Sequence, residues 1–270
     1  MRPMDERLQR VVNALAALPE IEVVAMSGEG FPKAGESDVD LYVYSARIPD
    51  GKARGEALSV LNDLAEKTVI ELFSSPVWGV GDMLTIDGVE VCLMHFTTQE
   101  ERDGALRVLR GEEMEKQGQF YPTGRLASLL DQKPLLERTP FLRNLQAEVR
   151  AYPPELSRKL TQRFLGALDD RESFERAVFR KDPLFFHQAL EYGLDDLLQG
   201  LFALNRVYFP SRKRTLQYVE KFALKPEKCG ERLLEIVRLG ANGDTLAQAY
   251  RLWDELAEET KKLAEASEIT

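Results

Sequence analysis

Strand-like and helix-like hydrophobic patterns alternate over roughly the first 98 residues of the chain. Short apolar runs rich in β-branched residues predict strands where breaker residues bound them, because such runs suit the pleated surface of a sheet. These runs cover residues 21–26, 39–44 and 68–73, with a hairpin over 83–96 that turns at Asp87-Gly88. Apolar residues that recur every three or four positions predict helices over residues 1–19 and 52–67. The N-terminal part is therefore expected to be a small α/β domain.

Helical periodicity replaces the strand pattern from about residue 99 to the end of the chain. Helices are predicted over residues 139–150, 154–169, 173–180, 183–208, 213–223, 226–239 and 245–266. Thr245 suits the N-cap of the last helix, and Gly240 suits the end of the helix before it. The predicted fold class is α+β, with a small mixed-sheet domain followed by an all-α helical domain. We place the first domain at residues 1–110, a connecting segment at 111–139 and the helical domain at 140–270.

The composition is that of a globular protein, with 44% hydrophobic and 30% charged residues in a chain of 270. A formal net charge of −9 disfavours long nucleic acid as the main partner, since no general positive field attracts a polyanion. The two cysteines, Cys92 and Cys229, lack the spacing of a disulfide framework or a zinc site, which favours a reducing compartment. The opening helix lacks the apolar core of a signal peptide, and no apolar stretch reaches the roughly 18 residues that span a bilayer. A cytoplasmic protein without a membrane partner is expected.

Two carboxylates, Asp38 and Asp40, lie two positions apart at the start of the predicted strand 39–44. Side chains two apart on a strand leave the same face, where two carboxylates repel each other unless a cation lies between them. Oxygen ligands of this kind suit Mg²⁺ or Mn²⁺. Upstream, Ser27 and Gly28 end the preceding strand in a turn whose hydroxyl and backbone N–H groups can point at a phosphate. The segment is a candidate site for a nucleoside triphosphate and its metal ions; the alternative is an exposed turn before a strand with one solvated face.

Residues 26–41 resemble the nucleotidyltransferase superfamily, whose fold is shared by kanamycin- and lincosamide-modifying enzymes and by polymerase beta. That family has a Gly-Ser turn, a loop and then Ser-Asp-x-Asp-Leu on the next strand. Ser37, Asp38, Asp40 and Leu41 match this motif, and Ser27 precedes Asp38 by 11 positions (38 − 27). Further segments are similar to a nucleotidyltransferase group with a long helical C-terminal domain of poorly defined function: residues 78–82, 87–91, 152–156, 180–182 and 201–210.

Two residues depart from the family's pattern. Met26 stands where the family usually has Gly, and it adds a side chain where the backbone approaches phosphates. Cys92 occupies the position that we align with the family's third carboxylate, although a cysteine there is more simply a small buried hydrophobe. Glu90 lies two residues earlier on the same strand face, about 6.6 Å along the strand, and is the candidate substitute. Its alternative role is that of a polar residue in an alternating hairpin strand.

The resemblance implies transfer of a nucleoside monophosphate from a nucleoside triphosphate, with ATP the expected donor, to a hydroxyl of an unknown small molecule or of a protein. Carried over by position, it assigns catalysis and one or two Mg²⁺ (or Mn²⁺) ions to Asp38, Asp40 and Glu90. The cradle for the outgoing phosphates falls to Ser27 and Gly28. Lys213 would neutralise the phosphate charge; its alternative role is that of a solvated cation in the turn 212–214.

Two other functions stay open beside this one. A catalytically weakened nucleotidyltransferase-like protein that binds a nucleotide or a protein partner would account for Met26 and Cys92. An antitoxin-like role is disfavoured by the long helical region, because such proteins are usually much shorter. His95 and His187 form no ligand-spaced cluster and are expected to be structural. The sequence leaves the roles of three further charged residues undecided: Asp82, Arg180 and Asp182.

Overall fold

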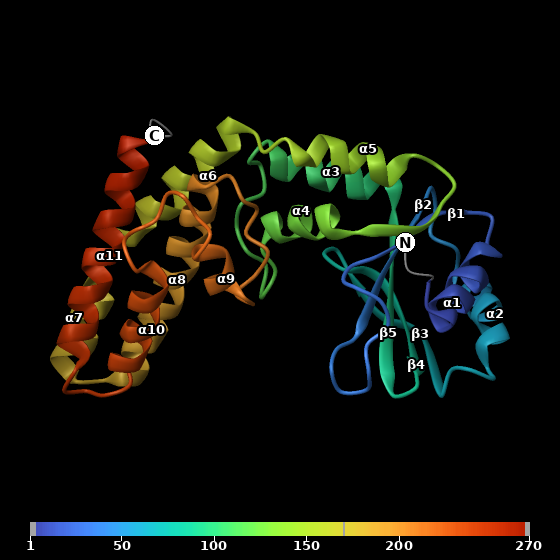
Figure 1. Ribbon diagram of the computed structural model, residues 1–270, viewed down its shortest axis with the longest axis horizontal. Helices are drawn as coiled ribbons and strands as arrows, with labels where there is room; N and C mark the ends of the chain where they lie inside the picture. The colour runs from blue at the N-terminus through green and yellow to red at the C-terminus, as the bar shows by residue number, and fades with distance from the viewer. Residues whose placement is uncertain (1–3, 170, 268–270) are drawn as a thin grey trace. The chain divides into compact units, whose positions relative to one another are not determined.

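Residues 4–169 and 171–267 are described by the computed structural model, in which the chain forms two compact units (Figure 1). Unit 1 comprises Met1–Arg107 and Ser128–Ala151, and unit 2 comprises Val108–Ala127 and Tyr152–Thr270. Unit 1 is built on a mixed sheet with helices, whereas unit 2 is built from helices. The α+β fold class predicted from the sequence is therefore confirmed.

The sheet of unit 1 has six strands in the order β3-β4-β5-β2-β1-β6. Their bounds are β1 (Ile21–Met26), β2 (Val39–Ser45), β3 (Lys67–Ser75), β4 (Gly79–Ile86), β5 (Val89–Thr97) and β6 (Lys133–Glu137). Among these described strands β2 and β5 run parallel, and the other four neighbouring pairs are antiparallel. The predicted hairpin turn is present, with Asp87 at φ 50° and Gly88 at φ 71°, values that favour Asp-Gly in a tight turn.

One face of the sheet carries the core of unit 1. Three helices supply its other side, α1 (Glu6–Ala16), α2 (Gly51–Leu58) and the short 3₁₀ helix η1 (Ser59–Leu61), with α1 and α2 side by side in Figure 1. α1 is amphipathic and begins at Asp5, whose carboxylate accepts a hydrogen bond from the Arg7 backbone N–H at 3.0 Å. The apolar residues of α1 pack into one cluster with Val24, Leu41 and Leu93 from three neighbouring strands. This burial fixes which side chains point to the opposite face.

The opposite face is lined by aromatic side chains at the centre of the sheet. The Tyr44 and Phe96 rings stack with their centroids 5.9 Å apart, and Phe141 of α5 (Phe141–Arg150) packs on Tyr44 at 5.2 Å. α3 (Thr98–Leu109) follows directly from β5, and α4 (Pro122–Asp131) directly precedes β6. Because side chains alternate along a strand, this face also receives the even-numbered residues at the start of β2.

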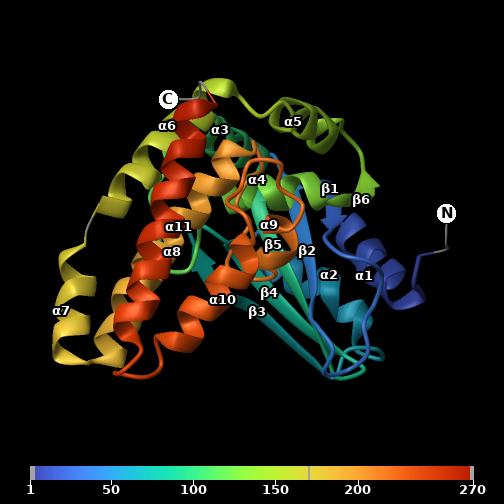
Figure 2. The same cartoon turned by 60° about the vertical axis from the view of Figure 1, so that its left-hand side comes forward.

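Unit 2 is organised around the long helix α8 (Pro183–Leu204), whose second half is almost entirely buried. Around it lie α6 (Pro154–Gly166), the 3₁₀ helix η2 (Ala167–Asp169), α7 (Glu172–Arg180), α9 (Thr215–Val219), α10 (Cys229–Leu239) and α11 (Leu246–Ala266). Figure 2 shows α11 running alongside α8 and α10. Gly200 allows α6 to approach α8 closely, since a Cβ there would lie 2.4 Å from Leu165 Cδ2. None of the described helices is both long and apolar enough to span a bilayer.

The region around residues 98–139 differs from its prediction. The expectation of no strand after residue 99 is wrong: β6 pairs with β1 as an edge strand. Its signal was hidden by Pro134, which lacks a backbone N–H and is tolerated at a sheet edge but argues against a central strand. The segment expected to connect two domains at 111–139 also contains α4. The two compact units include Ser128–Ala151 in unit 1 and Val108–Ala127 in unit 2, whereas the sequence placed the domain boundaries at residues 110 and 140.

Smaller differences concern helix ends. The helix expected over 213–223 is reduced to α9, and α3 covers a stretch with no predicted helix. Thr245 does occupy the N-cap of α11, but its hydroxyl donates to the Leu239 and Asn242 carbonyls instead of accepting from the helix. Asp182, left undecided by the sequence, caps α8 by accepting a hydrogen bond from the Phe185 backbone N–H at 3.1 Å.

Candidate functional site

Asp38 and Asp40 lie at the N-terminal end of β2, in the interior of the sheet. Asp40 is half-buried on the strand, whereas Asp38 is exposed just before it. Ser37 Oγ donates a hydrogen bond to the Asp38 carbonyl oxygen at 3.0 Å, which orders the turn into the strand. Leu41, between Asp40 and Tyr42, is directed into the core, so Asp40 points to the opposite, aromatic-lined face.

The register of the parallel pair places Asp40 directly beside Cys92 of β5. Burial raises the pKa of the Cys92 thiol to about 11, and the negative charges of Asp40, Asp38, Asp82 and Glu90 add to the effect. The thiol is therefore protonated at neutral pH, and a protonated thiol is a poor metal ligand and a poor nucleophile. The structure thus places a neutral group beside Asp40, where the resemblance leads us to expect a third carboxylate.

Glu90 lies two residues before Cys92 and is exposed on the same face of β5. Val91 pairs with Val39, the first residue of β2, so Glu90 lies one step beyond the paired part of the two strands. This position is level with Asp38, not with Asp40. Among the described residues no group of three or more His, Cys, Asp or Glu side chains is arranged to hold a metal ion. Two carboxylates fit Mg²⁺ nevertheless, since this ion keeps several waters and is commonly held by one or two carboxylates together with substrate phosphates.

The turn after β1 faces the same side of the sheet. Gly28 has φ +85° with no atom within 4 Å of an added Cβ, so the backbone conformation rather than crowding favours glycine there. Ala25 pairs with Tyr42, and Ser27 continues the alternation to the face that carries Asp40. Met26 pairs with Leu41 and packs into the core cluster. The side chain that Met26 adds at this position therefore points into the core, away from the face that carries Asp40.

Tyr42 joins the turn to the carboxylates. Ser128 Oγ, at the end of α4, donates a hydrogen bond to Tyr42 Oη at 2.8 Å. Burial raises the pKa of Tyr42; the hydrogen bonds with Ser128 and Ser27 oppose this rise, and the charge of Asp40 adds to it. The neutral phenol therefore makes hydrogen bonds with Ser128 and Ser27 and lies within the electrostatic influence of the Asp40 carboxylate. The sequence interpretation identified neither Tyr42 nor Ser128, because both positions read as ordinary core or connecting residues.

Lys133 supplies a cation beside the same turn. It is the first residue of β6 and pairs with Met26. Its Nζ donates a hydrogen bond to the Gly28 carbonyl oxygen at 3.3 Å and lies 4.0 Å from Glu29 Oε1. The sequence interpretation missed Lys133, since it expected residues 111–139 to be a connection. The backbone pairing of an edge strand is what brings this lysine to the turn.

Lys213, the predicted phosphate ligand, lies in unit 2 just before α9. It is exposed, and its backbone N–H donates to Ser211 Oγ at 3.1 Å. The neighbouring Arg212 pairs with the buried Asp195 at 2.7 Å, and Asp195 also binds Lys116 and, at 2.6 Å, the Tyr121 hydroxyl. Arg212 is thus one of the exposed or half-exposed cations around the buried Asp195, while the role of Lys213 stays a prediction.

Comparison with known proteins adds a family match and a structural likeness. Residues 120–214 match the family described as "Domain of unknown function (DUF4037)". Among solved structures, the chain is similar to a nucleotidyltransferase-like protein from Exiguobacterium sibiricum 255-15, with 12% identity and a TM-score of 0.48. That similarity covers 97% of this chain and 74% of the other. No curated protein sequence matches the chain significantly.

The family match assigns no chemistry, but it covers residues that the geometry brings into the candidate site. Ser128 and Lys133 both fall within residues 120–214. The structural likeness is too distant to support an argument about activity. The case for a function therefore depends on the residues of this chain.

A second charged cluster lies on the core face of the sheet. Asp82 is fully buried and accepts hydrogen bonds from Arg54 Nε at 2.8 Å and from the Glu71 backbone N–H at 2.8 Å. His95 Nε2 lies 3.0 Å from the same carboxylate. Burial opposes ionisation of Asp82, but the hydrogen bonds from His95, Arg54 and Glu71 outweigh it and lower the pKa to about 2. Asp82 is therefore a structural anion on the face opposite Asp40.

The prediction that His95 is structural agrees with this arrangement. Its imidazole is fully buried, and burial lowers its pKa although the Asp82 carboxylate opposes the shift. Glu71 contributes through a β-bulge at φ 57° that turns its N–H toward Asp82. This network ties α2 to three strands of the sheet and holds the scaffold of the candidate site.

Proposed function

We propose that unit 1 carries a magnesium-dependent nucleoside triphosphate site and transfers a nucleoside monophosphate to a hydroxyl group. The observation that carries the proposal is that two carboxylates lie beside a Ser-Gly turn at one end of the sheet, and that a lysine is hydrogen-bonded to this turn. ATP is the expected donor, and the acceptor is a small molecule or a protein. Anionic phosphates require cations and N–H donors, and a metal ion requires oxygen ligands; the site supplies each of these.

The proposed chemistry is an in-line displacement at the α-phosphorus. The acceptor oxygen forms a bond to the α-phosphorus while the bond to the bridging oxygen of the β-phosphate breaks, so pyrophosphate leaves and the acceptor proton passes to a base. Mg²⁺ would supply Lewis-acid stabilisation of the phosphoryl oxygens. Asp38 and Asp40 would hold the metal, and Glu90 is the candidate for the base. Ser27, the Gly28 backbone and Lys133 would bind and orient the outgoing phosphates.

The first test is calorimetric titration of the full chain with each of the four ribonucleoside triphosphates, with and without Mg²⁺. Unmutated protein is expected to bind at least one of them in a metal-dependent manner, and Asp38→Ala/Asp40→Ala is expected to lose that binding. The double variant Glu56→Ala/Asp63→Ala removes two exposed carboxylates elsewhere in unit 1 and serves as the control. If well-folded protein binds no triphosphate with Mg²⁺, the proposal is wrong.

Lys133 and Lys213 can be compared in the same assay. Lys133→Met is expected to weaken Mg²⁺-dependent triphosphate binding about tenfold, equivalent to about 1.4 kcal/mol, because it removes the cation beside the Gly28 carbonyl. Nucleoside binding should change much less, since a nucleoside has no phosphate to neutralise. Lys213→Met is the matched substitution in unit 2. A loss confined to Lys213→Met would contradict the role given to Lys133 and support the prediction from the family resemblance.

A second candidate function is nucleotide or partner binding without transfer. The protonated thiol of Cys92 beside Asp40 favours it, because that position adds no charge to hold a second metal ion. Measuring pyrophosphate release with bound nucleotide and a panel of hydroxyl acceptors separates the two functions. Metal-dependent binding with no release for any acceptor would favour the binding function.

A further inference from the structure

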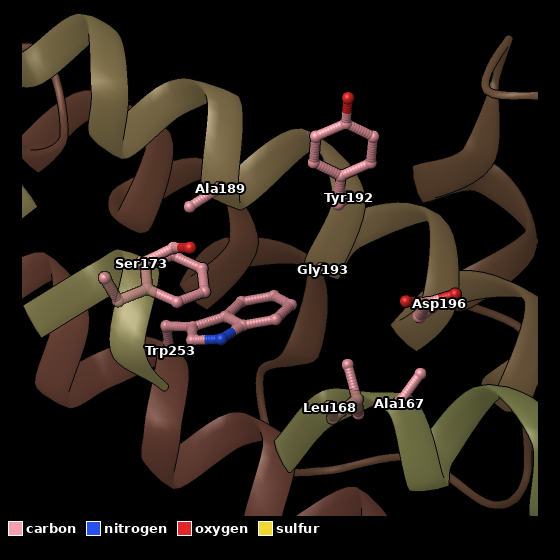
Figure 3. Close-up of a pocket in the computed structure, with 9 residues that line it drawn as sticks. Ala167, Leu168, Ser173, Ala189, Tyr192, Gly193, Asp196 and Trp253 are labelled. Atoms are coloured by element: carbon pink, nitrogen blue, oxygen red, sulfur yellow. The ribbon is translucent and has the colours of Figure 1, made fainter. Parts of the chain in front are cut away.

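Unit 2 contains a cavity enclosed by η2, α7, α8 and α11 (Figure 3). Its volume is about 90 Å³, roughly that of three water molecules at about 30 Å³ each. Aromatic and apolar groups, among them Phe174, Leu168 and Trp253, line just over half of its surface. Figure 3 shows the Trp253 indole in the middle of the lining, with Asp196 beyond it on α8. The cavity therefore combines an aromatic wall with one carboxylate.

The aromatic wall is built by close packing across three helices. Trp253 is only 3% exposed, and its ring stacks on Phe174 with centroids 5.6 Å apart. Gly193 lets the indole lie against α8, because a Cβ there would be 2.6 Å from Trp253 Cζ2. Aromatic faces carry negative potential and attract cations that come within about 6 Å of the ring centroid.

Asp196 differs from the neighbouring Asp195. Asp195 is paired with Lys116 and Arg212, whereas no hydrogen bond or ion pair involves Asp196 among the described residues. Arg163, the cation with the largest influence on Asp196, pairs with Glu115 at 2.9 Å. The Asp196 carboxylate is thus available to an incoming cation.

The charge environment of Asp196 sets its pH dependence. Burial raises its pKa to about 6; Arg163 and Lys116 lower it, while Asp195 and Glu115 raise it further. The carboxylate is mostly ionised at pH 7.5 and mostly protonated at pH 5. Any ligand that depends on its charge should bind with that same pH dependence.

We propose that this cavity binds a small organic cation of the methylated-ammonium class, held between the Trp253–Phe174 wall and the Asp196 carboxylate. The cavity volume admits a group of only a few heavy atoms, and the single carboxylate favours a ligand with a single positive charge. An apolar methyl shell around that charge suits the aromatic and aliphatic lining better than a strongly hydrated metal ion does. This site is independent of the nucleotide site proposed for unit 1.

The test uses tetramethylammonium chloride as the probe and the emission of Trp253 as the readout. The chain has two tryptophans, Trp78 and Trp253, so the full-length Trp78→Phe protein reports on the cavity alone. At pH 7.5 a saturable change is expected, with a dissociation constant on the order of millimolar for so small a ligand. Uncharged tert-butanol and sodium chloride of equal ionic strength should give no saturable change.

Asp196→Asn is expected to weaken tetramethylammonium binding about tenfold, because it removes the charge and keeps the shape. Asp254→Asn makes the same chemical change next to Trp253 in the sequence, at a carboxylate that pairs with Arg171 and does not line the cavity. It should leave binding unchanged. Protein with Asp196 intact should also bind about tenfold more weakly at pH 5 than at pH 7.5, which tests the charge without that substitution. Absence of saturation, or equal affinity for tert-butanol, would overturn the proposal.

Discussion

Replacing Arg54 with leucine is expected to lower the free energy of unfolding by about 3–5 kcal/mol, because it leaves the buried Asp82 carboxylate without its cation. Arg54 is 1% exposed and donates to Asp82 from Nε at 2.8 Å and from Nη2 at 3.2 Å. Neutral His95 and one backbone N–H would then remain as partners of the anion. Urea unfolding followed by circular dichroism at pH 7 measures the loss. Arg10→Leu removes an exposed arginine with one ion pair to Asp63 and should have little effect.

The double variant Arg54→Leu/Asp82→Leu makes this prediction more specific. If the loss in Arg54→Leu comes from an uncompensated charge, removing Asp82 as well should restore part of the stability. A double variant less stable than both single variants would instead indicate that hydrogen bonding and shape, not charge, dominate the cluster.

The same network predicts the direction of the acid response. The folded-state pKa of Asp82 is about 2, below the 3.8 of the unfolded chain, so its stabilisation is present above about pH 4 and is lost as the pH falls through 2. The pKa of His95 is lowered by burial, so protonation of the unfolded state also destabilises the fold as the pH falls below about 6.5. The free energy of unfolding should therefore fall from neutral pH to pH 2. In Arg54→Leu, this free energy should depend less on pH below pH 4.

Replacing Cys92 with aspartate is expected to strengthen Mg²⁺-dependent triphosphate binding about tenfold, since a third carboxylate would stand beside Asp40. Without metal the new charge lies near Asp38 and Asp40, and like-charge repulsion should lower the melting temperature of the protein. Added Mg²⁺ should reverse that loss. Calorimetric titration and thermal unfolding, each with and without Mg²⁺, measure the two effects.

Cys92→Asn is the matched control for this gain, because it has nearly the shape of aspartate without its charge. It should show neither tighter binding nor stabilisation by Mg²⁺. If Cys92→Asp also fails to respond to Mg²⁺, the face that carries Asp40 is not a metal site, and the proposed transfer chemistry loses its main support. Pyrophosphate release gained by Cys92→Asp alone would indicate that the unmutated chain binds nucleotide without transfer.

Local sequence patterns were sufficient to predict much of unit 1. The strand over 21–26 has its predicted bounds, and the Asp87-Gly88 turn lies where expected, because β-branched runs and positive-φ residues are strong local signals. β6 was missed because it is short and contains Pro134, so only pairing with β1 defines it. The roles of Tyr42, Ser128 and Lys133 were missed for a related reason, since each depends on neighbours more than 80 positions away in the sequence.

The sequence by itself determined the α+β class, the strands of the sheet core and the position of Asp38 and Asp40 at the start of β2, since these follow from periodicity and alternation. Only the tertiary structure decided that Met26 points into the core, that Cys92 stands beside Asp40 and that Lys133 lies next to the Gly28 turn. It also decided that Asp82 is a buried structural anion and that Asp196 lines a cavity. The physical reason is that strand register and helix packing bring together residues that are far apart in the sequence. The local sequence around one residue does not indicate which distant residues will contact it.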